Sequence, residues 1–69
     1  MDYNKEREYN KFADMLIKGF FSMNELRKII SSEFVAEASS VQSDPNYPEY
    51  QKYKIQLQDG DVYYIYVLP

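Results

Sequence analysis

The sequence contains no cysteine and no histidine among its 69 residues. Without cysteine there is no disulfide and no zinc–thiolate site, and without histidine a nitrogen-ligated metal site is excluded as well. The same absences exclude nucleophilic catalysis by a cysteine or by a Ser–His pair. With only two glycines, the chain has no glycine-rich phosphate-binding loop. We therefore expect a protein that is not an enzyme and that holds neither a cofactor nor a metal ion.

Long apolar runs are absent too. No stretch approaches the roughly 18 apolar residues of a membrane span, and the segment MDYNKEREYN is too polar for a signal peptide. Together with the lack of cysteine, this predicts a cytoplasmic protein with no membrane partner. The formal net charge of −3 disfavours nucleic acid as a partner. Between Lys28 and Lys52 there is no basic residue, and the interval contains a candidate acidic patch formed by Glu33, Glu37, Asp44 and Glu49.

Aromatic residues, by contrast, are abundant. Eight tyrosines and four phenylalanines give this short chain large apolar side chains. The length predicts one small domain covering residues 1–69, close to the lower limit for a self-sufficient core. Stability must come from packing alone, or from packing combined with self-association.

The most informative stretch is residues 50–68, in which two apolar runs flank Asp59-Gly60. An Asp-Gly pair predicts a β-hairpin with a two-residue type I′ turn. In that register Leu57 faces Val62 and Ile55 faces Tyr64. One side of the hairpin then gathers the apolar residues Tyr53, Ile55, Leu57, Val62, Tyr64, Tyr66 and Leu68. A three-residue loop with Gly60 in a bulge is the alternative, and it shifts the partner strand by one residue.

Two helices are predicted before the hairpin. Residues 2–18 carry apolar side chains at helical spacing, and Gly19 is placed to end this helix. Ser22 is followed three residues later by Glu25, a capping box that starts a second helix running from Met23 to about Ser31.

The segment MLIKGFFSMNELRKI, within residues 12–30, resembles the helical hairpin of short C-terminal (SHOCT) domains. The resemblance is carried by Leu16, Gly19, Phe20, Phe21, Ser22, Glu25 and Leu26. It implies a small interaction module and transfers no catalytic residue to this chain.

Residues 33–42 fit either a strand or a continuation of the second helix. We favour a strand, because an isolated hairpin is marginally stable and its apolar face needs a third strand. Residues 43–49 are a loop rich in turn residues. The predicted fold is α+β, with two N-terminal helices packed on one face of a small antiparallel sheet (α-α-β-β-β) and a β-hairpin at the C-terminus. Its expected core contains Tyr9, Phe12, Leu16, Leu26, Ile30, Phe34, Ile55, Leu57, Tyr64 and Tyr66.

In this register Tyr63, Ile65 and Val67 remain on the side of the hairpin away from the helices. We therefore predict that they form a docking patch for a protein partner or a second copy, flanked by Lys52 and Lys54. A strand lying centrally in the sheet, with residues 33–42 on its far edge, is the alternative explanation of its two apolar sides.

The function expected from the sequence is a non-enzymatic protein–protein interaction module. Its composition resembles that of small phage or mobile-element proteins that bind and modulate, often inhibit, a host protein. One alternative is a small homodimeric structural domain. Another is a single-stranded nucleic-acid binder that uses Lys52, Lys54 and Tyr63. Asp59 and Asp61 could form a carboxylate pair, but a tight turn explains both of them.

Overall fold

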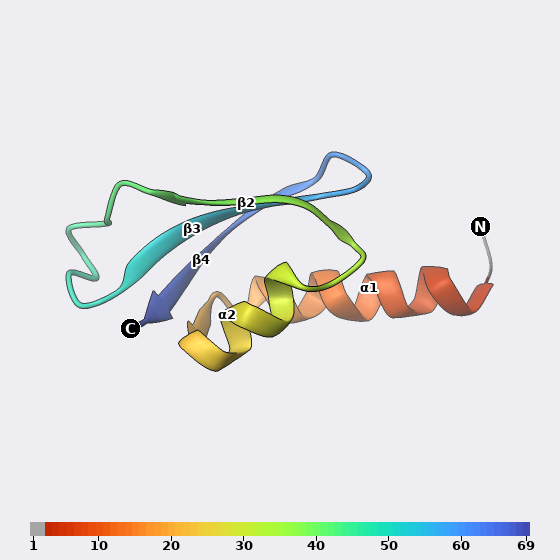
Figure 1. Ribbon diagram of the computed structural model, residues 1–69, viewed down its shortest axis with the longest axis horizontal. Coiled ribbons are helices and arrows are strands. Elements are labelled where there is room, and N and C mark those ends of the chain that lie inside the picture. The colour runs from red at the N-terminus through yellow and green to blue at the C-terminus, as the bar shows by residue number, and fades with distance from the viewer. Residues whose placement is uncertain (1–2) are drawn as a thin grey trace.

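The computed structural model describes residues 3–69 and shows two helices and a four-stranded sheet (Figure 1). In chain order the elements are α1 (Tyr3–Ile17), β1 (Phe20–Ser22), α2 (Met23–Ile30), β2 (Val35–Val41), β3 (Gln51–Leu57) and β4 (Val62–Leu68). The α+β class is confirmed. The predicted α-α-β-β-β order is wrong, because β1 lies between the helices. The sheet is also not purely antiparallel, since β1 pairs with β4 in parallel.

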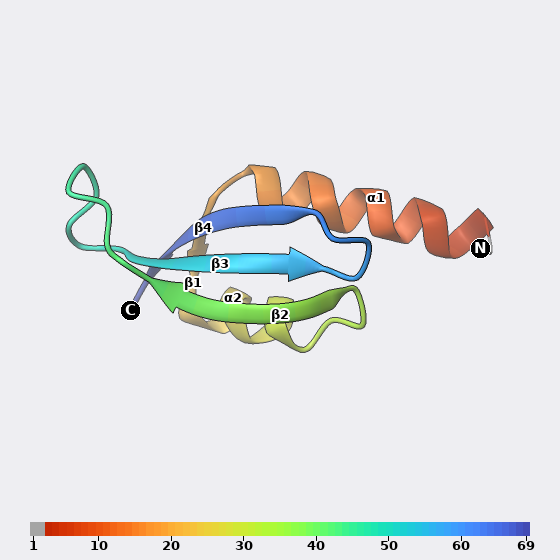
Figure 2. The same cartoon turned by 90° about the horizontal axis from the view of Figure 1, so that it is seen from above.

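The strand order is β1-β4-β3-β2, and both helices lie on the same face of the sheet (Figures 1 and 2). We call the other side the open face. The strand interpretation of residues 33–42 is confirmed, because α2 ends at Ile30 and β2 pairs with β3. The predicted start of the first helix at residue 2 lies outside the described residues.

The β3–β4 hairpin does not have the predicted two-residue turn. Ile55 pairs with Tyr63, and the Leu57 and Asp61 backbones close a three-residue loop. A type I′ turn needs positive φ at both central residues, whereas Gly60 alone in this loop has it, at 96°. Asp59 keeps a negative φ, and its carboxylate accepts the Asp61 N–H at 3.0 Å. The predicted register is therefore wrong by one residue, and the bulged alternative is the one observed.

This shift decides which face of the hairpin is buried. The core consists of Leu16, Phe21, Leu26, Ile29, Ile55, Leu57, Ile65 and Val67. Of the predicted core residues, Leu16, Leu26, Ile55 and Leu57 are buried, while Tyr9 and Phe12 pack against the cluster. Tyr64 and Tyr66 were placed in the core wrongly, because the observed register puts them on the open face. Phe34, also predicted in the core, is half-buried and packs its ring against those of Tyr9 and Phe12 at the edge of the core.

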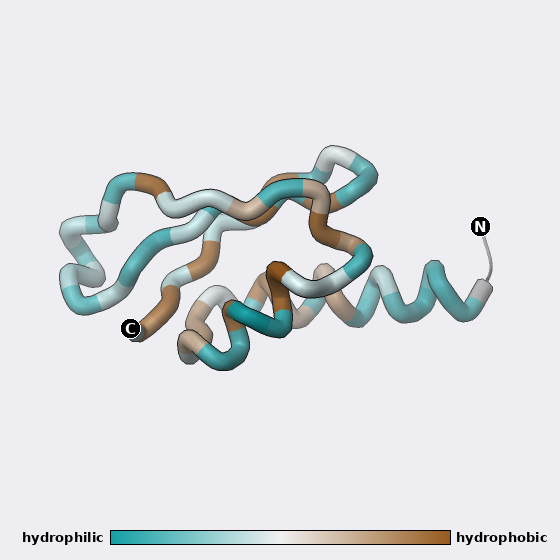
Figure 3. The backbone as a smooth tube through the Cα atoms, in the orientation of Figure 1, coloured by the Kyte–Doolittle hydropathy of each residue, from teal (hydrophilic) through white to brown (hydrophobic). Residues whose placement is uncertain are grey.

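The helices explain the remaining differences. On α2, Leu26 and Ile29 are buried against the core, whereas Ile30 lies at the margin below β2 and remains 48% exposed. On α1, Leu16 is the buried residue near the C-terminal end. The N-terminal half of this helix is hydrophilic and projects beyond the sheet (Figure 3).

Candidate functional site

The three side chains predicted to form a docking patch lie on the helix-covered face. Ile65 and Val67 are fully buried, and Tyr63 packs against the core. Their predicted exposure is wrong for the same reason as the register, because a shift of one residue moves every side chain of β4 to the opposite face. The alternative explanation of the two apolar sides, a strand lying centrally in the sheet, is correct in part. β4 is central, but its outer neighbour is β1 rather than β2.

Lys52 and Lys54 do lie on the open face, where Tyr64 and Tyr66 take the place expected for Tyr63. Cross-strand neighbours on this face form three rows. The row nearest the hairpin turn contains Glu37, Gln56 and Val62, and the middle row contains Ser39, Lys54 and Tyr64. The row farthest from the turn contains Val41, Lys52, Tyr66 and Phe20. The face is thus polar near the hairpin turn and aromatic at the other end of the sheet.

At the aromatic end, four rings form what we call the aromatic cluster: Phe20, Tyr47, Tyr50 and Tyr66. Phe20 from β1 stacks on Tyr66 from β4 with a centroid distance of 5.2 Å. Tyr47 and Tyr50 come from the loop of residues 42–50, and each meets Phe20 edge-on at 5.3 Å. Aromatic pairs at such distances add stability beyond the area that they bury. The loop is therefore held on the sheet by ring contacts.

A carboxylate completes this arrangement. Asp44 accepts the Tyr66 hydroxyl at 2.9 Å and the Asn46 N–H at 2.9 Å. These two hydrogen bonds, the Asn46 bond first, lower the pKa of Asp44. The hydrogen bond to Asp44 raises the pKa of Tyr66. At neutral pH, therefore, an ionised Asp44 binds a neutral Tyr66 and fixes the loop to β4.

The lysines lie beside these rings. The Lys52 ammonium is 5.0 Å from the Tyr64 ring centroid and 5.8 Å from that of Tyr66, both within cation–π range. The cross-strand neighbours of Lys54 are Ser39 and Tyr64, neither of which is charged. Two positive charges thus lie in the middle of an aromatic face.

Comparison of the chain with protein-family models, with curated proteins and with solved structures gives no match. The site has to be interpreted from its own chemistry. Within residues 3–69 no group of three or more potential metal-ligating side chains comes together, and neither helix is long and apolar enough to cross a membrane.

The structure does not gather the predicted acidic patch in one place. Glu33 lies in the turn before β2 and forms an ion pair with Lys5 at 3.3 Å. Glu37 lies on β2, while Asp44 and Glu49 lie in the loop that follows it. Because β2 is seven residues long, its two ends are about 20 Å apart. We therefore do not treat the four carboxylates as one surface.

The aromatic cluster was missed by reasoning from the sequence. Tyr47 and Tyr50 lie on either side of Pro48-Glu49 in an otherwise polar loop, where the sequence shows no partner for large rings. That placement was the available signal, because aromatic residues in a surface loop need something to pack against. The Phe20-Phe21 pair was a second signal, since adjacent residues of a strand point to opposite faces.

Proposed function

We propose that this chain is a protein-interaction domain that binds another protein through its open face. The observation that supports this most strongly is the exposure of large apolar side chains around the aromatic cluster. Tyr64 is 52% exposed, and the same side carries the exposed side chains of Phe20, Tyr47, Val62 and Leu68. Contiguous apolar patches on a small domain mark interaction sites, and tyrosine is enriched at protein interfaces.

The chemistry of the face also indicates the kind of partner. Rings that are already packed against one another lose little conformational freedom when a partner covers them, which favours binding. The central Lys52 and Lys54 favour a partner with carboxylates beside its apolar contact. We therefore expect an acidic and apolar protein surface. A protein covered in this way would have its own site blocked, which is how we propose that the domain modulates a host protein.

The resemblance of residues 12–30 to SHOCT domains implies the same class of function, although β1 separates the two helices and no family model matches the chain. Such domains are small interaction modules, and the capping box that carries part of the resemblance is present between Ser22 and Glu25.

Single-stranded nucleic acid is the second candidate, because two lysines lie beside Tyr64 and Tyr66 on an open sheet face. Bases stack on free ring faces, however, and here Phe20 covers Tyr66 while Lys52 lies over Tyr64. Asp44 also places a negative charge at the cluster. We expect no binding of single-stranded DNA or RNA at physiological salt. Micromolar binding that weakens with salt and with Lys52→Ala would establish the second candidate instead.

Affinity capture from host lysates with matched variants tests the proposal. Tyr64→Ser removes an exposed ring from the open face, and Ile17→Ser removes an apolar side chain that is 68% exposed on α1. We expect Tyr64→Ser to lose the captured protein and Ile17→Ser to retain it, with both variants folded by circular dichroism. Retention by Tyr64→Ser together with loss by Ile17→Ser would move the site to the helical layer and refute the proposal.

A further inference from the structure

The edge of the sheet formed by β2 is a second surface, separate from the open face. β2 is the last strand in the order β1-β4-β3-β2, so one side of its backbone has no neighbouring strand. In an antiparallel edge strand every second residue directs its N–H and C=O away from the sheet. These groups are available to pair with another strand.

β2 carries little of what normally protects such an edge. Natural edges are guarded by lysine, proline, inward-pointing charges, bulges or short length. The strand VAEASSV has seven residues and contains neither lysine nor proline. One bulge lies at its beginning, between Val35 and Glu37. The opposite edge is β1, which is only three residues long. Extension of the sheet is therefore favoured on the β2 side.

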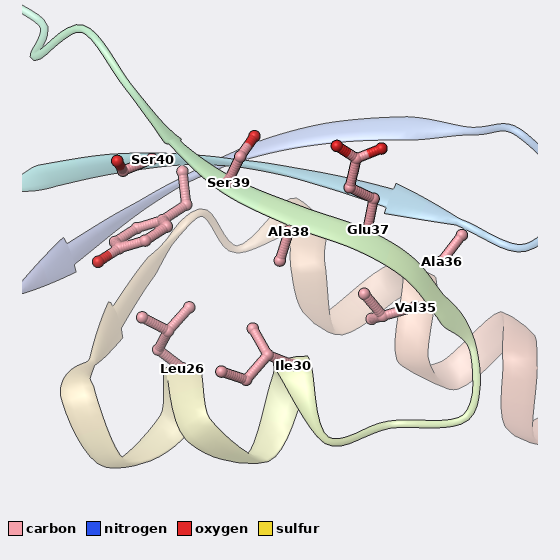
Figure 4. A pocket seen from close by; sticks show the side chains of 9 residues that line it. Leu26, Ile30, Val35, Ala36, Glu37, Ala38, Ser39 and Ser40 are labelled. Carbon is pink, nitrogen blue, oxygen red and sulfur yellow. The ribbon is translucent and has the colours of Figure 1, made fainter.

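A groove lined by both apolar and polar side chains runs below this edge, between β2 and α2. It has a volume of about 470 Å³. Figure 4 shows Leu26 and Ile30 pointing from α2 toward the strand, with Val35 and Ala38 pointing down from β2. Ile30, at 48% exposure, is an apolar side chain that the domain itself leaves uncovered. A second element placed beside β2 would therefore gain backbone hydrogen bonds and apolar contacts together.

We propose that this element is β2 of a second copy, paired antiparallel about a twofold axis at Ala38. The four strands of each copy then form one continuous sheet. This register places all seven residues of the strand opposite their counterparts, with the bulge between Val35 and Glu37 falling at both ends of the new pair.

The charges of β2 support this self-pairing. With the axis at Ala38, Glu37 lies opposite Ser39 of the second copy, and Ser39 lies opposite the other Glu37. A shift of the axis to Glu37 would place two carboxylates directly opposite each other, which destabilises a strand pair. The register that gives the longest pairing is thus also free of direct like-charge contacts. The small side chains of Ala38, Ser39 and Ser40 let the backbones approach without a clash.

The groove is filled by the same symmetry. A twofold axis perpendicular to the sheet places the helices of both copies on one side. Because α2 lies below β2 (Figure 2), the sheet has to bend at the new strand pair so that the two α2 axes are about 8–10 Å apart, the distance of packed helices. Ile30 of each copy then covers apolar surface of the other. The two open faces lie together on the opposite side, and the dimer presents two aromatic clusters to a partner, which raises its avidity.

Sedimentation velocity over a range of concentrations tests the dimer, and a charge exchange tests its register. Ser39→Glu places a new carboxylate opposite Glu37 of the second copy at two symmetric positions, so we expect the dimer dissociation constant to rise about tenfold or more. The double variant Ser39→Glu/Glu37→Lys turns both repulsions into attractions and should restore the dimer. Ser43→Glu, in the exposed loop after β2, is the matched control and should leave association unchanged.

Amide hydrogen exchange tests the backbone pairing directly. The outward-facing N–H groups of β2 should become protected as concentration rises and should lose that protection in Ser39→Glu. A protein that stays monomeric at millimolar concentration refutes the proposal. So does a dimer that survives Ser39→Glu, or one whose β2 amides exchange freely. Protection of β2 only when an added apolar peptide is present would assign the edge to a peptide ligand and would also refute self-pairing. None of these outcomes decides whether the open face of one copy binds a partner.

Discussion

Gly60 adopts the conformation that the observed three-residue hairpin loop requires. Its φ of 96° belongs to a conformation that residues with a β-carbon rarely adopt, and the space around it is open. One residue with positive φ gives a three-residue loop, whereas two would give the tighter turn. The difference moves β4 by one position relative to β3. It thereby exchanges Tyr64 for Ile65 in the core.

This exchange gives the first prediction. Ile65 is fully buried, so Ile65→Lys places an unpaired charge in the core and should unfold the protein at 25 °C. The neighbouring Tyr64 is 52% exposed, and Tyr64→Lys should change the free energy of unfolding by less than about 1 kcal/mol. Circular dichroism with urea titration measures both. A folded Ile65→Lys variant, or an unfolded Tyr64→Lys variant, would contradict the observed register.

The same residues show how far the sequence could predict the fold. Leu16, Leu26, Ile55 and Leu57 were placed in the core correctly, because each belongs to a run whose period is clear. Along β4 the residues on both faces of the strand are apolar, so their alternation does not indicate which face is buried. The predicted register therefore depended on the Asp59-Gly60 pair, which is compatible with a two-residue or a three-residue loop. Only the packing against the helices resolves it.

Among the elements, α2 is the one that the sequence specifies most locally. The capping box between Ser22 and Glu25 was predicted and is present, with the Glu25 N–H donating to Ser22 Oγ at 3.2 Å and the Ser22 N–H donating to Glu25 Oε1 at 2.9 Å. Its residues are neighbours in sequence, so no tertiary information is needed to find it. β1 is the opposite case. Three residues have no detectable period, and their strand conformation depends on pairing with β4, more than forty positions later.

The capping box contributes measurably to the stability of α2. Ser22→Ala removes the acceptor for the Glu25 N–H and should lower the free energy of unfolding by about 1 kcal/mol. Because α2 has only eight residues, the loss of its cap should also be visible as faster amide exchange in its first turn. Ser43→Ala, a change at an exposed loop position, is the control and should have no effect. Equal stability of the two variants would show that β1 pairing, not the cap, holds the start of α2.

At the scale of the whole molecule, the two faces of the sheet have separate roles. The helix-covered face contains the whole buried core, while the open face contains the aromatic cluster and the central lysines. The loop of residues 42–50 joins β2 to β3 and folds back on the open face, so the surface proposed for binding is built from three distant parts of the chain. This assembly from distant segments is why the aromatic cluster was not predicted from the sequence, whereas the wrong docking patch of Tyr63, Ile65 and Val67 came from the register error.

The hydrogen bond from Tyr66 to Asp44 makes this assembled surface sensitive to pH. The pKa of Asp44 is lowered, so its stabilising contribution is fully present above the ordinary aspartate pKa of about 3.9 and is lost as the pH falls through the lower value of the folded protein. The pKa of Tyr66 is raised, so its contribution is present below the ordinary tyrosine pKa of about 10 and is lost as the pH rises through the folded value. Lys52 also favours the ionised form of Asp44, and Tyr47 raises the pKa of Tyr66 to a smaller degree.

We therefore expect the loop to leave the open face in acid while the core remains folded. The Tyr66 ring resonances, followed by NMR from neutral pH downward, should change with a midpoint below about 3.9. Glu25 and Asp59 also have lowered pKa values, but neither touches Tyr66, so a local probe separates them from Asp44. Asp44→Ala should give ring resonances at neutral pH that match the acid form of the parent and should abolish the transition. If the transition persists in Asp44→Ala, or has its midpoint above the ordinary aspartate value, then the carboxylate does not hold the loop. Because the loop supplies Tyr47 and Tyr50 to the aromatic cluster, partner binding by the open face should weaken over the same pH range.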